Sequence, residues 1–295
     1  MNIIIDKDIF LKYLNNIGPG SKTQSIALLI RILEHQENKI LLTKKIIERL
    51  EKEINSDPKM LYTFQAFFKD ISDSNRCETV NSIKEEEQEE ILEIFEMTDS
   101  IDCKFVLLGE YKTIYEKNPE FINHTCFFNT IIKPNKCWLI FHLLANRTIS
   151  VRYSDFSSNR SIEQFFFTYF HLPLNFKDIL ILDSYCNVGY HNLFLPIAKK
   201  GFPIFIHTSA FNKLDSEINL IRRELKDYFG NKNTHVKFST DKKLLHERTI
   251  AVREFILESN HDFAEIRREN RNWKVDITIS SLVYEDLIDR CQNYN

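Results

Sequence analysis

Glycine and proline are scarce in this chain, with 6 glycines and 7 prolines among 295 residues. Flexible and extended linkers are rich in these residue types, so the composition argues against long linkers. No apolar run approaches the ~20 residues that a membrane-spanning helix needs. The first residues also lack the charged stretch and apolar core of a secretory signal. We therefore expect a cytoplasmic protein with no membrane partner.

Paired cysteine motifs are missing as well. The six cysteines form no CxxC pair and no repeating spacing, which argues against a structural zinc site and fits reduced thiols. Walker, dinucleotide-binding and haem-attachment motifs are also absent, so we do not expect nucleotide hydrolysis coupled to work. The cysteines are Cys77, Cys103, Cys126, Cys137, Cys186 and Cys291.

Phenylalanine is abundant, with 24 copies, and the chain is long enough for about two aromatic-rich cores. Its charge is uneven. Residues 1–135 carry 17 Lys and Arg against 23 Asp and Glu, whereas residues 136–295 carry 22 against 19. An acidic half suits a metal site and a mildly basic half suits anion binding, although a solvated Glu-rich helix would produce the same contrast.

The first half reads as α/β. Apolar runs at 2–5, 40–42 and 105–108 predict buried parallel strands. Amphipathic stretches between them predict helices over 9–14, 21–33, 43–54, 58–68 and 83–97. Two of the strands end at acids, Asp6 and Glu110. Because ligands of open α/β sheets gather at the carboxyl ends of the strands, we expect these acids to lie together.

This half, over about residues 1–132, resembles PIN-like nuclease domains. The resemblance rests on Ile3-Ile4-Ile5-Asp6, on the Ile-Leu-Leu-Thr strand and cap at 40–43 that precedes Glu48 and Glu51, and on Leu107-Leu108-Gly109-Glu110. It implies that Asp6, Glu48 or Glu51, and Glu110 hold Mg²⁺ or Mn²⁺, which activates water and neutralises the scissile phosphate.

The remaining acid of that family has several candidates here, since Asp73, Glu86 and Glu87 all compete for its place. Two other interpretations of the acids stay open: Asp6 as a helix N-cap, and the glutamates as a solvated helix face. A catalytically inactive PIN-like domain is the corresponding functional alternative.

We expect a domain boundary near residues 133–136, giving domains 1–134 and 135–295. In the second domain we predict strands at 138–144, 148–153, 178–185, 204–209, 236–238, 246–250 and 273–282. Helices are expected after Ser161 and over 191–199, 214–229 and 284–291. Basic clusters are modest: Arg222, Arg223 and Lys226; Lys242 and Lys243; Arg267, Arg268 and Arg271.

His246 and Arg248 stand two residues apart on an apolar, β-branched background. In a strand they would share a face, and an imidazole beside a fixed cation suits binding or attack of a phosphodiester. An ordinary edge strand with a solvated Arg is the alternative. Asp183 and Tyr185 end a neighbouring predicted strand and could form hydrogen bonds to the site. His207 is predicted to be a buried residue at the end of a strand.

Residues 160–282 resemble phospholipase D-like domains. The motifs are Ile-Leu-Ile-Leu-Asp-Ser-Tyr at 179–185, Leu-His-Glu-Arg-Thr-Ile at 245–250 and Phe-Ile-Leu-Glu-Ser-Asn at 255–260. The resemblance implies His246 as nucleophile, Arg248 in place of the family's Lys, and Ser259 and Asn260 as phosphate contacts. The chain departs from the family in three ways: Arg248 replaces the Lys, the Asp that follows it in the family is missing, and the motif occurs once. Because the family's active site is built from two copies, catalysis would require a homodimer.

We therefore predict an α/β protein of two domains: a PIN-like parallel sheet with helices, followed by a phospholipase D-like α/β sandwich. The predicted function is metal-dependent hydrolysis of RNA or DNA, with the second domain binding phosphate and dimerising. Pairing two nuclease-type folds resembles bacterial effectors of antiviral defence. The alternatives are a catalytically inactive scaffold that recruits a partner protein or nucleic acid, and metal-free cleavage at a dimeric His246 site.

Overall fold

The computed structural model divides the chain into two compact units, Met1–Asn146 and Arg147–Asn295. Both are mixed α/β, as the sequence predicts. None of the described helices is long and apolar enough to cross a membrane. The residues described are 1–97, 104–110, 113–131, 133, 135–172, 178–184, 186, 191–230, 232–240 and 248–292.

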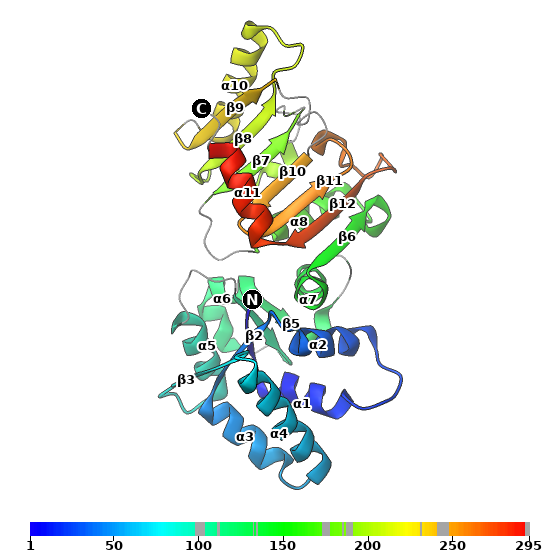
Figure 1. The fold of residues 1–295 in the computed structure, drawn as a ribbon, viewed down its shortest axis with the longest axis vertical. Helices are drawn as coiled ribbons and strands as arrows, with labels where there is room; N and C mark the ends of the chain where they lie inside the picture. Colours follow the sequence, from blue (N-terminus) through cyan, green and yellow to red (C-terminus); the bar gives the residue numbers. More distant parts are fainter. Residues whose placement is uncertain are drawn as a thin grey trace. The chain divides into compact units, whose positions relative to one another are not determined.

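The first unit is built on a five-stranded parallel sheet with the order β3-β2-β1-β4-β5 (Figure 1). Its strands are β1 (Asn2–Ile5), β2 (Lys39–Thr43), β3 (Cys77–Val80), β4 (Lys104–Leu108) and β5 (Thr125–Phe127). Its helices are α1 (Lys7–Asn16), α2 (Gln24–Glu34), α3 (Lys44–Ile54), α4 (Pro58–Asp73), α5 (Glu87–Met97), α6 (Pro119–His124) and α7 (Lys136–Asn146).

β1 lies at the centre of this sheet because its residues are apolar on both faces. Ile3 is opposite Ile40 of β2 on one side and Phe105 of β4 on the other. All four residues of β1 are buried. Such a continuous apolar run is typical of a parallel strand covered by helices on both faces. Since all five strands are parallel, their carboxyl ends meet at one edge of the sheet.

Polar residues directly after the strands begin the next helices at that edge. Asp6 caps α1 by accepting a hydrogen bond from Ile9 N–H, and Thr43 caps α3 in the same way from Ile46 N–H. The strand-to-helix turns are therefore short, and they bring the first turns of α1 and α3 to the carboxyl edge.

The second unit holds a seven-stranded mixed sheet with the order β6-β12-β11-β10-β7-β8-β9. Its strands are β6 (Thr148–Arg152), β7 (Ile179–Asp183), β8 (Ile204–Ser209), β9 (Thr234–Ser239), β10 (Arg248–Val252), β11 (Phe255–Ser259) and β12 (Lys274–Ile279). Its helices are α8 (Asn159–Phe170), α9 (His191–Phe194), α10 (Asp215–Phe229) and α11 (Ser281–Gln292).

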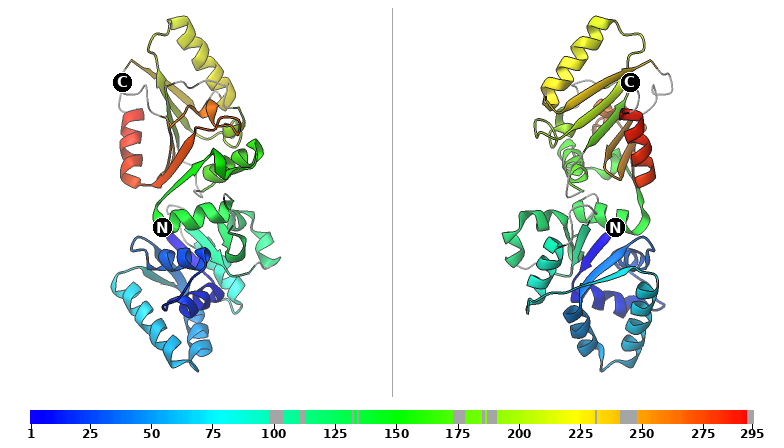
Figure 2. Two further views of the ribbon diagram at one scale, coloured as in Figure 1. Left: turned by 90° about the vertical axis from the view of Figure 1, so that its right-hand side faces the viewer. Right: turned by 60° about the vertical axis from the view of Figure 1, so that its left-hand side comes forward.

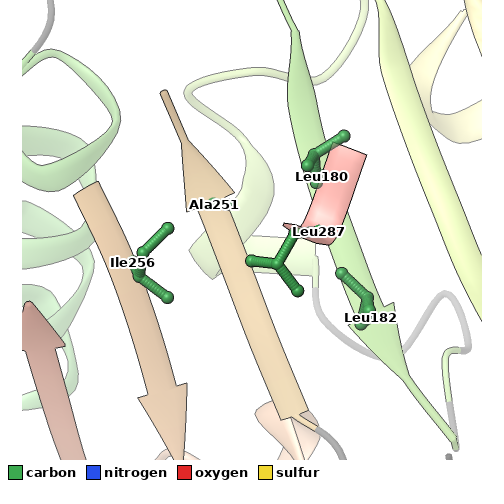
Figure 3. Close-up of a cluster of buried hydrophobic side chains, with 5 residues drawn as sticks. All are labelled: Leu180, Leu182, Ala251, Ile256 and Leu287. Carbon is green, nitrogen blue, oxygen red and sulfur yellow. The ribbon is translucent and has the colours of Figure 1, made fainter. Parts of the chain in front are cut away.

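Helices flank this sheet on both faces, with α11 on one side and α10 on the other (Figure 2). Leu287 of α11 packs on side chains from three neighbouring strands (Figure 3). These partners are Leu180 and Leu182 of β7, Ala251 of β10 and Ile256 of β11. On the other face, the buried Tyr169 of α8 donates its hydroxyl to the carbonyl oxygens of Ile250 and Phe255.

Several sequence-based predictions of elements were wrong. Residues 138–144, predicted as a strand, belong to the helix α7, which is capped by Asn135 accepting from Trp138 N–H. The α7 run is apolar on nearly every face, so its period does not distinguish a buried helix from a buried strand. Because α7 packs with the first unit, that unit extends to Asn146, beyond the predicted boundary at residue 134.

Candidate functional site

Asp6 occupies the centre of the carboxyl edge of the first sheet. Its Oδ1 accepts from Ile9 N–H at 2.8 Å and its Oδ2 accepts from Gly109 N–H at 2.7 Å. The pKa of this carboxyl is raised to about 7, chiefly by burial. The two hydrogen bonds lower it and the nearby charges of Asp8 and Glu87 raise it, and both effects are smaller than that of burial. Asp6 is thus a buried acid that titrates near neutral pH.

Two more acids stand beside it, and we refer to Asp6, Asp8 and Glu87 as the edge acids. Glu87, the first residue of α5, accepts from Lys7 N–H at 2.7 Å through its Oε1. Asp8 packs so closely against Gly109 that a Cβ there would lie 2.7 Å from the Asp8 Cβ. Glu87 was one of three candidates for the remaining acid, and this position favours it.

The charges of the edge acids also act on Tyr115. It is 2% exposed and stacks on Phe121, with ring centroids 4.9 Å apart. Burial raises the pKa of its phenol, and the negative charges of the edge acids raise it further. Asp8 and Glu87 therefore act on Asp6, and all three acids act on Tyr115.

The predicted glutamates of α3 lie elsewhere on the helix. The side of α3 that faces α5 and Lys7 is formed by Lys45, Arg49 and Glu53, which are spaced four residues apart. Glu48 and Glu51 are exposed and lie on other sides of the helix. Their placement gives no support to a role as metal ligands. Glu53, the next-to-last residue of α3, pairs with Lys7.

The other predicted acids also separate. Glu110 is exposed and directly follows Gly109 at the carboxyl edge. Asp73 ends α4 just before β3 begins, which places it toward the opposite edge of the sheet. Glu86 is exposed, next to Glu87.

The edge acids fit Mg²⁺ or Mn²⁺ in their chemistry, because hard divalent cations prefer carboxylate oxygens and would relieve the repulsion among three acids. Their arrangement is not that of a closed ligand cage. Within the described ranges, no group of three or more His, Cys, Asp or Glu side chains has the geometry to hold a metal ion.

Arg248 opens β10 in the second unit and pairs with an acid. Its Nε donates to Oδ1 of Asp262, and its residue partner across the sheet is the buried Asp183 at the end of β7. The guanidinium that was expected to grip phosphate is thus already held beside carboxylates. His246 and Tyr185 lie outside the described residues.

Ser259 and Asn260, the other predicted phosphate contacts, hold the connection between β11 and β12. Ser259 Oγ donates to His261 O at 2.6 Å and accepts from His261 N–H. Asn260 donates to Asn272 O and accepts from Lys274 N–H at 2.6 Å. Both side chains therefore have a structural role, and their phosphate contacts stay a prediction.

Comparisons with known proteins show no family. No family model matches, and no curated protein matches. Two solved structures are weakly similar over 50% of this chain, each at 12% identity. One is TrmBL2, an archaeal chromatin protein, with a TM-score of 0.31 and 52% of its chain covered. The other is a polyphosphate kinase from Porphyromonas gingivalis, with a TM-score of 0.32 and 26% covered. Likenesses at this level carry no argument about function.

Sequence reasoning missed Asp8 at the edge, Glu53 of α3 as the partner of Lys7, and Asp262 in the second unit. Asp8 carries a usable signal, since an acid in the first turn of a helix that starts at the end of a strand lies at the strand's carboxyl end. Glu53 and Asp262 carry none, because their positions depend on which side of α3 meets α5 and on how the chain turns after β11.

Proposed function

We propose that the first unit hydrolyses phosphodiester bonds of RNA or DNA with Mg²⁺ or Mn²⁺ at the edge acids. The observation that carries this proposal is the electrostatic coupling of Asp6, Asp8 and Glu87 at the carboxyl edge of a parallel sheet. The charges of Asp8 and Glu87 act on the buried carboxyl of Asp6, and a divalent cation would offset that repulsion.

The chain's own residues supply orientation there. Ile9 and Gly109 hold both oxygens of Asp6 in place, so its rotamer is set before any ligand arrives. Asp8 and Glu87 are only partly buried, and their side chains would have to turn toward the cation to join Asp6 as ligands. A bound metal would activate water and neutralise the scissile phosphate. Glu110, exposed one residue after Gly109, is within the same edge and remains part of the proposal.

Cleavage of end-labelled single-stranded RNA and DNA in Mg²⁺, Mn²⁺ or EDTA tests this function. Asp6→Asn and Glu87→Gln should each lower the metal-dependent rate on the order of 100-fold. Glu48→Gln removes the same kind of charge from an exposed side of α3 and should leave the rate unchanged. Metal-dependent cleavage that persists in Asp6→Asn and Glu87→Gln would show that the edge acids are not the site of hydrolysis.

A catalytically inactive nucleic-acid-binding protein is the second candidate. Two observations favour it: both oxygens of Asp6 already accept main-chain hydrogen bonds, and Arg248 is already paired with Asp262. This candidate predicts binding of oligonucleotides without cleavage under any metal condition. Cleavage that resists EDTA and is lost in His246→Ala would instead favour metal-free hydrolysis at the second unit.

Dimerisation and a defence role extend the proposal. One copy of the His246–Arg248 motif is present, so a site built from two copies requires two chains. Light scattering on the full chain should then give the mass of a dimer, and a monomer at working concentrations would exclude that arrangement. Loss of protection against phage in cells carrying Asp6→Asn would support the defence role.

A further inference from the structure

A basic pocket of about 240 Å³ lies in the second unit where β8 and β9 meet α10. β9 is the outermost strand of its sheet, so this region is at the sheet's open edge. The apolar part of the lining comes from Phe205, Ile206 and Val236. The other described lining residues are Arg222 and Lys226 of α10, together with His207, His235 and Lys237, whose side chains alternate onto the α11 face of the strands.

The two cations that α10 contributes to this pocket, Arg222 and Lys226, have no acidic residue beside them in the described lining. Arg222 and Lys226 are one helical turn apart, and neither forms an ion pair with a carboxylate in the described ranges. No acid stands three or four positions from either of them, where a helical partner would lie. Arg222 donates only to the neutral Asn219, at 3.1 Å.

Aromatic rings accompany the cations. On the α11 face of the same strands, Phe205 stacks on His235 with ring centroids 4.8 Å apart and packs against the Leu287 cluster. On the α10 face, Phe238 of β9 is the aromatic neighbour of the cations. The guanidinium of Arg222 lies 5.2 Å from the centroid of the Phe238 ring. A cationic surface interleaved with aromatic rings is the combination that binds single-stranded nucleic acid, since cations contact phosphates and rings stack on bases.

We propose that this pocket binds the phosphate backbone of single-stranded nucleic acid. The ligand class rests on the proposed function, but the pocket's binding does not require cleavage. The site is separate from the predicted Arg248 site, where the guanidinium is paired with Asp262. Arg222 and Lys226 supply the phosphate contacts, and the Phe238 ring beside the Arg222 guanidinium supplies a surface for a base.

Fluorescence anisotropy with a labelled single strand of about 12 nucleotides, matched to the footprint of a compact binding groove, measures this binding. EDTA is present throughout, so that no metal-dependent cleavage takes place. The test variant is Arg222→Gln/Lys226→Gln in the full chain. The matched control, Arg223→Gln/Lys232→Gln, removes the same charge from exposed residues that do not line the pocket.

The test variant should weaken binding about tenfold more than the control. The slope of log affinity against log salt should fall by about 1.4, because each phosphate contact with a single strand contributes about 0.7. Equal effects of the two double variants, or no binding by the wild type, would overturn the proposal. If the double variant unfolds, Lys226→Gln alone gives the same test, and it should lower the salt slope by half as much.

Three further measurements separate the sources of an effect. Phe238→Ala should weaken the binding of single strands more than that of duplexes, because duplex bases are not free to stack. Competition by inorganic phosphate alone, with no preference for a strand, would overturn the nucleic-acid assignment. Asp6→Asn should bind single strands as the wild type does, because Asp6 belongs to the first unit. A wild type that binds through Arg222 and Lys226 but never cleaves would refute the proposed hydrolysis without refuting the proposed binding.

Discussion

Gly109 donates its main-chain N–H to Oδ2 of Asp6, 103 residues away in sequence, at 2.7 Å. This bond joins the residue after β1 to the residue after β4. Ile9 N–H holds the other oxygen of the same carboxyl. The carboxyl edge of the first sheet is therefore organised around one buried acid, and that arrangement gives the predictions that follow.

Gly109→Ala should destabilise the first unit by about 1–3 kcal/mol, because the added Cβ would lie 2.7 Å from the Asp8 Cβ. Gly18→Ala is the matched control, since a Cβ at Gly18 meets nothing within 4 Å. Urea denaturation of both variants measures the difference. A Gly109 variant as stable as the Gly18 variant would show that Asp8 can move away freely.

The stability of the protein should depend on pH through Asp6. Its folded-state pKa is raised from 3.8 to about 7, so the folded state binds this proton more tightly than the unfolded state. Its stabilising contribution is complete below pH ~4 and is lost as pH rises through ~7, by up to about 1.4 kcal/mol per pH unit. Asp6→Asn removes the titrating group.

Denaturation of wild type and Asp6→Asn at several pH values between 4 and 8 tests this dependence. The free energy of unfolding of the wild type should fall relative to that of the variant across the window. Parallel curves for the two proteins would mean that Asp6 keeps its ordinary pKa in the fold.

Arg49 should be important for the stability of the edge. It pairs with Glu90, whose side chain is fully buried, at 2.6 Å. Arg49→Met leaves a buried carboxylate without its ion pair and should cost about 3 kcal/mol. Lys45→Met breaks an ion pair with the exposed Glu85 and should cost less than about 1 kcal/mol. Thermal unfolding of the two variants compares them directly, and equal shifts in Tm would contradict the difference in burial.

Asp262→Asn should release Arg248 for phosphate. The variant removes the carboxylate that forms the ion pair with the guanidinium, so oligonucleotide binding should strengthen and its salt slope should steepen by about 0.7. Adding Arg248→Gln should cancel the gain. A gain that persists in the double variant would come from the overall change in charge and not from Arg248.

The sequence predicts the centre of the first sheet well. β1 is a run of buried residues followed by a capping Asp, and such local signals survive folding because both faces of the strand are covered. The edge strands were missed. β3 has the sequence Cys-Glu-Thr-Val and is mostly exposed, so it lacks the apolar pattern that identifies a central strand.

The candidate site was predicted only in part, for a reason of geometry. Asp6 and Glu87 follow strand ends, and the parallel topology brings such residues together. Glu48 or Glu51 was predicted because both follow the Ile-Leu-Leu-Thr strand and cap, and both are exposed on other sides of α3. The side of α3 that faces the edge is set by Arg49 pairing with Glu90, and sequence spacing does not show that contact.

Binding of Mn²⁺ to the full chain, followed by electron paramagnetic resonance of the free ion, tests the central claim most directly. We predict a bound Mn²⁺ in the wild type and in Glu48→Gln, and its loss in Asp6→Asn and Glu87→Gln. A wild type that leaves all Mn²⁺ free, or Asp6 and Glu87 variants that bind it as the wild type does, would contradict a metal site at the edge acids.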